Sequence, residues 1–297
     1  MVVVGNLSVG GSGKTPLVIW VVTQLRAAGF VPGIVLRGYG GSASRGHEIV
    51  RVRADSDPAL VGDEALLSHR RTGAPVAVGR NRVRAARLLL AGGVDVIVSD
   101  DGLQHLALAR NFEIAVIDGE RGFGNGYLLP AGPLREPRAR IGSVDAVVIN
   151  GEGRYWREAS TQDPGGAFTM RLLGDRLALV GGGPESRALS GLAGQRVHAV
   201  AGIGNPQRFF SQLRAAGLEI IEHAFPDHHR YRPDELAFGD ELPVLMTEKD
   251  AVKCSALGGQ NRWYLPVTAE FEPAEGAALF GRLRRSLEEP IRARAGD

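Results

Sequence analysis

Short apolar runs alternate with longer amphipathic stretches along the first half of the chain. The runs are nearly continuously apolar, as expected of strands covered on both faces. They predict strands at residues 2–4, 33–40, 75–79, 94–102, 112–118 and 144–150. The amphipathic stretches predict helices over about 15–28, from 62 onwards and over 81–92. This alternation is typical of a doubly wound, mostly parallel α/β sheet.

The pattern changes after about Asn150 and indicates a second, smaller α/β domain. Residues 166–183 predict a β-hairpin that turns at Gly174 and Asp175. The remaining elements are strands at 196–204, 218–225 and 262–267, a helix over 206–217, a strand leading into a helix over 243–254, and a helix over about 273–287. We therefore expect a first domain over 1–150 and a second over 151–297, entered through the hairpin.

The segment 118–142 is too long and too rich in Gly and Pro to be an ordinary connector. Structureless loops of this length are usually functional or disordered. The segment combines Leu128, Leu129 and Leu134 with arginines such as Arg135. This mixture favours a functional loop.

Composition narrows the possible classes of protein. With 297 residues and 44% apolar residues, the chain has enough material for one large or two ordinary domains. The net charge of +2 argues against a dedicated nucleic-acid binder. The single cysteine, Cys254, excludes an internal disulfide, and no apolar run reaches the roughly 18–20 residues that span a bilayer.

Only three of the 35 Lys and Arg residues are lysines, namely Lys14, Lys249 and Lys253. A lysine kept against such a bias is consistent with a place where a compact ammonium is needed rather than a planar guanidinium. Lys249 and Lys253 lie four apart on one face of a predicted helix. Ordinary pairing with acids in the same helix is one interpretation, and phosphate or substrate binding is the other.

The stretch "SVGGSGKTP" between a predicted strand and a predicted helix is typical of a phosphate-binding loop. Backbone N–H groups of such a loop converge on phosphate oxygens at the start of the helix. Lys14 would reach the β- and γ-phosphates, and the Thr15 hydroxyl would bind Mg²⁺. The residues expected around ATP are Ser8, Val9, Gly10, Gly11, Ser12, Gly13, Lys14 and Thr15.

Asp100 and Asp101 end the buried strand at 94–102. Ligands of open α/β sheets bind outside the carboxyl ends of the strands, where an acidic partner for Mg²⁺ belongs. The two carboxylates point in different directions, so only one is expected nearest the metal. A turn-forming role before Gly102 is the alternative, and Gln104 is either a supporting or a purely structural residue.

Two further motifs allow both a structural and a functional interpretation. Asp63 and Glu64 open a predicted helix, where acidic residues commonly cap the first turn, and the sequence alone favours this capping role. Asp227, His228 and His229 follow a predicted strand in "FPDHHRY". A histidine there suits a general base, although adjacent loop histidines are often structural.

Taken in order, "GNLSVGGSGKTP", "LRGYG", "VGDEALLSHR", "GRNR", "SDDGLQH", "NGYLLPAGPLREP", "GIGNPQRFF", "FPDHHRY" and "TEKDAVKC" resemble the tetraacyldisaccharide 4′-kinase family of lipid A biosynthesis. The resemblance covers nearly the whole chain, and the family carries serine at the position of Ser8. It implies a P-loop NTPase-like fold. It also implies an ATP- and Mg²⁺-dependent kinase that phosphorylates the 4′-hydroxyl of a tetraacyldisaccharide 1-phosphate.

The resemblance also implies roles for individual residues. Lys14 and Asp101 would be catalytic, with Thr15, Asp100 and Asp101 on the metal side. Asp63 and His228 would form the base pair, with His228 chosen because it directly follows Asp227. The possible nucleotide, phosphate or substrate contacts are Glu64, Arg80, Arg82, Gln104, Arg135, Glu136 and His229.

By the same resemblance, the partners would be an acylated glucosamine disaccharide 1-phosphate and a membrane surface, with no nucleic acid and no obligate protein partner. The enzyme would be peripheral, at the cytoplasmic face of the inner membrane of a Gram-negative bacterium. Members of the family normally carry a few dozen residues before the phosphate loop, including a membrane-contacting helix. Alternatives are a soluble small-molecule P-loop kinase or ligase, or a P-loop switch ATPase.

Overall fold

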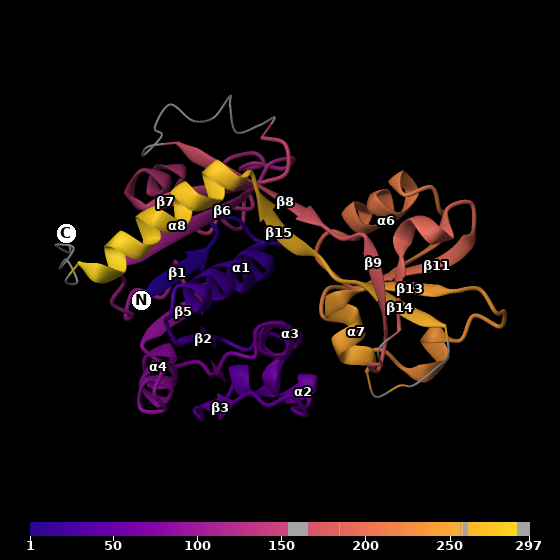
Figure 1. Ribbon diagram of the computed structural model, residues 1–297, viewed down its shortest axis with the longest axis horizontal. Helices are drawn as coiled ribbons and strands as arrows, with labels where there is room; N and C mark the ends of the chain where they lie inside the picture. The colour runs from indigo at the N-terminus through magenta and orange to yellow at the C-terminus, as the bar shows by residue number, and fades with distance from the viewer. Residues whose placement is uncertain (154–165, 184, 256, 258–260, 290–297) are drawn as a thin grey trace.

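Two α/β units make up the chain, and each has a sheet at its centre (Figure 1). The computed structural model describes residues 1–153, 166–183, 185–255, 257 and 261–289. The α/β class and the mostly parallel sheets that the apolar pattern predicts are confirmed.

The larger sheet has nine strands within the described residues, and all pairs from β8 to β4 are parallel. The edge strands β15 and β3 run antiparallel to their neighbours. In spatial order the strands are β15 (Thr268–Phe271), β8 (Ala167–Leu173), β7 (Ala146–Asn150), β6 (Phe112–Asp118), β1 (Val2–Gly5), β5 (Val96–Asp100), β2 (Pro32–Leu36), β4 (Val76–Val78) and β3 (Val50–Arg51).

Helices cover both faces of this sheet. Among the described residues, the α-helices of this unit are α1 (Lys14–Ala27), α2 (Pro58–Val61), α3 (Asp63–Thr72), α4 (Arg82–Leu90) and α8 (Pro273–Glu288). One face packs against α1, α3 and α8, with Leu17, Leu66 and Leu279 fully buried. On the other face, α4 covers one side and the segment 118–144 covers the rest. Because the strands are buried on both faces, they read as continuous apolar runs.

The smaller sheet has six strands within the described residues, four of them parallel. Their order is β10 (Ser186–Ala188), β9 (Arg176–Leu179), β14 (Arg262–Leu265), β13 (Val244–Thr247), β11 (Arg196–Ala201) and β12 (Glu219–Ala224). Helix α6 (Pro206–Ala215) buries Phe210 and Leu213 on one face of this sheet. Helix α7 (Glu248–Cys254) packs with Tyr231 and Leu236 on the other.

The hairpin predicted over 166–183 is wrong. β8 pairs with β7 and β15 in the larger sheet, whereas β9 pairs with β10 and β14 in the smaller one. The chain therefore passes from one sheet to the other at Gly174 and Asp175 instead of folding back. Alternating residues next to a glycine suit both arrangements, and the pairing partners of each strand decide between them.

The chain returns to the larger sheet between β14 and β15, and α8 then packs on that sheet (Figure 1). We therefore propose that the second unit spans about 175–266, because β8, β15 and α8 complete the core of the first. The parts of the predicted 151–297 domain at 154–165 and 290–297 lie outside the described residues.

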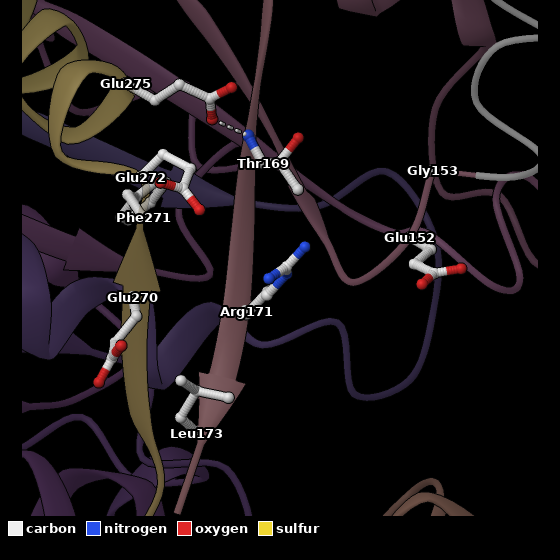
Figure 2. A pocket seen from close by; sticks show the side chains of 9 residues that line it. All are labelled: Glu152, Gly153, Thr169, Arg171, Leu173, Glu270, Phe271, Glu272 and Glu275. Atoms are coloured by element: carbon white, nitrogen blue, oxygen red, sulfur yellow. Dashed lines mark hydrogen bonds between the residues drawn. The ribbon is translucent and has the colours of Figure 1, made fainter.

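A pocket lies beside the β8–β15 pair, apart from the residues predicted to carry chemistry (Figure 2). Its acidic lining consists of Glu152, Glu270, Glu272 and Glu275, with Arg171 among them. Glu275 already accepts a hydrogen bond from the Thr169 backbone N–H at 2.8 Å (Figure 2). This pocket is separate from the candidate active site.

Candidate active site

The phosphate loop connects β1 to α1, as the sequence predicts. Gly10 and Gly13 have φ angles of 100° and 92°, in the left-handed region that favours glycine. A Cβ at Gly13 would also lie only 2.5 Å from the amide nitrogen of Asn150, which donates to the Ser12 carbonyl at 3.0 Å. The loop is thus held in one backbone conformation with its residues at the start of α1.

Lys14 and Thr15 begin α1 and face the end of the neighbouring strand β5. β1 and β5 are parallel, with Val4 opposite Asp100. The Lys14 ammonium donates to the Asn6 side chain at 3.2 Å and lies 3.6 Å from a carboxylate oxygen of Asp101. The Thr15 hydroxyl donates to Asp100 at 3.2 Å. The register of the sheet therefore brings the phosphate loop and the two acids together.

The carboxyl group of Asp100 fits a divalent cation. Burial raises its pKa to about 7, and the charge of Glu64 adds to the shift. Its Oδ1 has no hydrogen-bond partner among the described residues. Hard oxygen ligands from a carboxylate and a hydroxyl suit Mg²⁺, which usually takes its other ligands from phosphates and water.

Asp101 has a different environment from its neighbour. Its carboxylate accepts from Arg135 at 2.9 and 3.0 Å and faces Lys14. Burial alone would raise the pKa of Asp101, but these two cations outweigh it and hold the pKa below its usual value. Asp100 is therefore the acid beside Thr15, whereas Asp101 is held in a salt bridge. A metal role for Asp101 stays a prediction.

Arg82 lies beneath these acids and is only 6% exposed. One of its guanidinium nitrogens donates to the backbone carbonyls of Asp100 at 3.1 Å and Asp101 at 2.7 Å. This arrangement makes Arg82 a support for the end of β5 rather than a group open to a ligand. Arg80, by contrast, is exposed.

Gln104 and Glu136 form a second support. The Gln104 amide donates to the Asn6 carbonyl at 3.2 Å and to the Glu136 carboxylate at 2.6 Å. Arg140 pairs with Glu136 at 3.3 Å. These contacts connect the first residue after β1 to the segment that carries Arg135. Direct substrate contacts of Gln104, Arg135 and Glu136 stay predictions.

Asp63 and His228 meet across the two units. Asp63 begins α3 and is 4% exposed, and the Nδ1 atom of His228 lies 3.1 Å from both of its carboxylate oxygens. His228 has a φ of 59°, a conformation uncommon for residues other than glycine. A Cβ at Gly40 would lie 3.1 Å from the same Nδ1 atom. The glycine at that position lets the histidine ring approach Asp63.

The contact shifts the pKa of both groups. The hydrogen bond with Asp63 raises the pKa of His228 above its ordinary value, against the effect of burial. Burial would raise the pKa of Asp63, but His228 and the charges of Lys249 and Lys253 lower it. The pair is therefore stabilised as a carboxylate beside an imidazole that holds its Nδ1 proton.

His229 points into its own unit. Its Nε2 lies 3.0 Å from the Glu235 carboxylate, and its ring stacks on Phe225 with centroids 4.7 Å apart. The two adjacent histidines thus have separate partners. His228 reaches the other unit, whereas His229 packs within the second unit.

Both lysines of "TEKDAVKC" also reach the first unit. α7 packs against α3. Lys249 pairs with Glu64, and the Lys253 ammonium lies 3.9 Å from Asp63. Lys253 also pairs with Asp250 of its own helix at 2.8 Å. The pairing within one helix that the sequence allows is confirmed for Lys253, and phosphate or substrate binding by the two lysines stays a prediction. The acids across the interface belong to another element, α3.

The sequence did not point to several residues that bring the second unit onto the phosphate loop. A Cβ at Gly204 would lie 3.3 Å from the Gly11 nitrogen and 3.5 Å from the Asp227 carboxylate. Arg208 of α6 donates to the Asn150 side chain at 2.9 Å. The glycines of "GIGNP" were a usable signal, since a glycine after a strand often marks a close backbone approach.

The segment 118–142 packs beside the same loop. Val9 donates to the Pro133 carbonyl at 2.9 Å, and Arg121 donates to the Gly11 carbonyl at 2.9 Å. Leu128 and Leu129 are 46% and 52% exposed, whereas Leu134 is 1% exposed in the core. Leu134 therefore does not share an exposed apolar surface with Leu128 and Leu129, because it lies in the core with Ile141.

In the described part of the chain, no helix is both long enough and apolar enough to cross a membrane.

The chain is similar to known proteins over nearly its whole length. The sequence model of the family described as tetraacyldisaccharide-1-P 4′-kinase matches residues 1–284. A tetraacyldisaccharide 4′-kinase of Methylobacillus flagellatus is 51% identical over 293 residues, which are 98% of this chain and 84% of that protein. One of Alkalilimnicola ehrlichii is 54% identical over 289 residues, 96% of this chain and 82% of that protein.

A crystal structure of LpxK from Aquifex aeolicus in complex with ATP is also similar. The TM-score is 0.74 at 28% identity, and the match covers 96% of this chain and 88% of that one. The matches by sequence and by fold cover both units. The chain therefore belongs to the tetraacyldisaccharide-1-P 4′-kinase family.

Proposed function

We propose that this chain is an ATP-dependent kinase of lipid A biosynthesis. It transfers the γ-phosphoryl group to the 4′-hydroxyl of a tetraacyldisaccharide 1-phosphate and yields the bis-phosphorylated lipid A precursor. The observation that carries the proposal is the position of Gly204, which lies close both to Gly11 of the phosphate loop and to Asp227, the residue before His228 of the buried Asp63–His228 pair.

The loop and Lys14 bind the phosphates. The N–H groups at the start of α1 face the β- and γ-phosphoryl oxygens, and the Lys14 ammonium neutralises charge there. Asp101 and Asn6 hold that ammonium in place before the nucleotide arrives. Thr15 and Asp100 would hold Mg²⁺, which supplies charge neutralisation across the phosphates when it is bound.

The Asp63–His228 pair activates the acceptor. Asp63 keeps the proton on Nδ1 of His228, so Nε2 is the basic atom. As the sugar oxygen forms its bond to the γ-phosphorus, the bond from that phosphorus to the leaving oxygen of ADP breaks, and the hydroxyl proton passes to Nε2. General-base catalysis of this kind contributes about 10²–10⁴-fold.

Contact between the two units keeps water from competing as the acceptor. Gly204 covers the phosphate loop, and Arg208 connects α6 to Asn150 beside it. Closure of two lobes around a nucleotide is a common way for kinases to exclude water.

The acceptor carries acyl chains, so the enzyme works at a membrane surface. Tyr127, Leu128 and Leu129 are exposed by 65%, 46% and 52% next to the phosphate loop, and Arg135 lies in the same segment. An apolar surface with adjacent cations suits a lipid with anionic groups. We assign the enzyme to the cytoplasmic face of the bacterial inner membrane, where ATP and the lipid precursor are both available.

The test is a kinase assay with ATP, Mg²⁺ and the tetraacyldisaccharide 1-phosphate acceptor. The parent chain should form the 4′-phosphorylated product, and Asp63→Ala should lose at least about 100-fold in kcat. A panel of soluble sugars and nucleosides serves as the comparison. Turnover of a soluble acceptor without turnover of the lipid would overturn the assignment.

The proposed lipid surface has its own experiment. Leu128→Asp with Leu129→Asp should weaken binding to anionic vesicles and raise KM for the lipid acceptor, with the affinity for ATP unchanged. Leu106→Asp is the matched control, since Leu106 is 78% exposed elsewhere on the chain. Unchanged vesicle binding and unchanged lipid KM in the double variant would exclude this surface.

A further inference from the structure

The three lysines of the chain all lie at the candidate active site. Lys14 belongs to the phosphate loop, and Lys249 and Lys253 come from one face of α7. Each of them pairs with an acid of the first unit. Arginine supplies the rest of the basic residues, so the lysines mark the places where a compact ammonium fits between closely spaced acids.

Lys253 is the most enclosed of the three. Its side chain is 8% exposed, and its ammonium lies 2.8 Å from Asp250 and 3.9 Å from Asp63. The ammonium also lies 5.2 Å from the centre of the Tyr231 ring. A cation thus sits between a carboxylate of its own helix and the carboxylate that holds His228.

Asp250 fixes the position of this cation. It is fully buried and accepts hydrogen bonds from the Gly202 N–H at 3.0 Å, the Tyr231 hydroxyl at 2.9 Å and the Thr247 hydroxyl at 2.5 Å. These three donors come from three different segments of the second unit. The carboxylate therefore cannot turn away. The Lys253 ammonium forms an ion pair with it, makes no hydrogen bond within the described part of the chain, and lies within ion-pair distance of Asp63 as well.

Lys249 differs from Lys253 in this respect. Its side chain is 26% exposed, and its partner Glu64 is exposed to the same extent. A pair with this access to water is screened more strongly than an enclosed one. Both lysines lower the pKa of Asp63, Lys249 more than Lys253, but Lys253 is the more buried of the two.

We propose that Lys253 is a positioning residue for the reaction, one that holds the Asp63–His228 pair in its working orientation and makes the pair complete only when α7 is seated on α3. The inference rests on the proposed kinase function. Lys253 touches Asp63 and no reacting atom. It acts by keeping the Asp63 carboxylate charged and pointed at Nδ1 of His228.

The charges around the Asp63–His228 pair explain why the Lys253 ammonium affects the pKa of His228. Besides Lys253, the pair faces two acids, Glu64 and Asp227, and one cation, Lys249. A third acid, Asp250, lies behind Lys253. Three acids, Glu64, Asp227 and Asp250, already face two lysines around the pair, and loss of the Lys253 ammonium would leave Lys249 as the one lysine beside them. The pKa of His228 would then rise further, and the histidine would be protonated, and inactive as a base, at a higher pH.

The experiment compares Lys253→Met with Lys253→Arg. Lys253→Met should lower kcat about tenfold, leave KM for ATP unchanged and move the acidic limb of the kcat/KM profile up by about one pH unit. NMR titration of the His228 ring, assigned with His228→Gln, should show the same upward shift. Lys253→Arg keeps the charge and should return the limb close to that of the parent.

Arg71→Gln is the matched control, because Arg71 pairs with Glu248 at 2.8 Å between the same two helices and away from the Asp–His pair. Arg71→Gln should leave the acidic limb of the kcat/KM profile at the pH of the parent. An unshifted limb and an unshifted His228 titration in Lys253→Met would overturn the inference, because a purely structural lysine would change stability without moving either.

If Lys253→Met fails to fold because Asp250 is left without its cation, the double variant with Asp250→Asn removes both charges. A smaller upward shift of the same sign is expected, and no shift would overturn the inference. The NMR titration needs no turnover. A parent chain without kinase activity would therefore overturn the proposed function alone.

Discussion

The phosphate loop and the Asp63–His228 pair serve one proposed reaction but are built in opposite ways. The loop is a single stretch, Ser8 to Thr15, within one unit, and its shape follows from glycines with positive φ. The pair joins side chains 165 positions apart in the chain and in different units. One half of the site is local, and the other exists only where two units touch.

This difference determines what each half depends on. The backbone of the loop is held by β1, α1 and Asn150, all in the first unit. The pair depends on the seating of α7 on α3 and on the pairs that Lys249 and Lys253 make there. Separation of the units would leave phosphate binding in place and remove the base.

The largest effect is expected in the local half. Lys14→Met should lower kcat by about 10³-fold, because it removes the cation aimed at the charge of the transferring group. It should also weaken nucleotide binding, measured by titration calorimetry with a non-hydrolysable ATP analogue. Unchanged nucleotide affinity with a lowered rate would mean that Lys14 acts only in the transition state.

The half between the units should give a smaller loss. His228→Gln keeps a polar side chain but removes the base, and should lower kcat by about 10²-fold. Nucleotide affinity should stay at the parental value, because the loop belongs to the other unit. A parallel fall in nucleotide affinity would show that the two halves are not independent.

A smaller effect is expected in the pH dependence of activity, which reports on the Asp63–His228 pair and not on the phosphate loop. The pKa of His228 is raised above 6.5, chiefly by its bond to Asp63, so the parent should lose activity as pH falls through that raised value. Asp63→Asn removes the carboxylate, so the pKa falls and the acidic limb should move to lower pH by about one unit. The measurement is kcat/KM between pH 5 and 9. A limb at the parental position in Asp63→Asn would contradict the assignment of the base.

The smallest effect is expected at the neighbouring histidine. His229→Gln should change kcat by no more than about twofold, because His229 bonds to Glu235 and packs on Phe225 within the second unit. Its effect should appear in thermal unfolding instead. A loss of rate as large as that of His228→Gln would mean that the two histidines exchange roles when substrate binds.

Much of the fold was predictable because its signals are local. The strands at 94–102 and 112–118 carry continuous apolar runs, and each contains an observed strand, Val96–Asp100 and Phe112–Asp118. The failures lie where pairing is decided at a distance. β8 and β9 read as a hairpin, yet each finds its partners in a different sheet.

The same difference between local and long-range signals applies to the candidate site. The strand–loop–helix context was enough to predict the phosphate loop at Lys14 and Thr15. The partners of Arg82 could not be predicted, because an arginine that supports backbone carbonyls and one that binds phosphate look alike in sequence. The burial of Leu134 could not be predicted either, because burial depends on which residues pack against a side chain.

By itself, the sequence determined most of the strands and helices and the backbone of the phosphate loop, because periodicity and glycine conformation act over a few residues. Tertiary structure decided which acid lies beside Thr15, which histidine reaches Asp63 and where the two lysines of α7 place their charges. Those outcomes depend on Coulomb interactions and burial between groups far apart in the chain, and such groups become neighbours only when the units are folded and in contact.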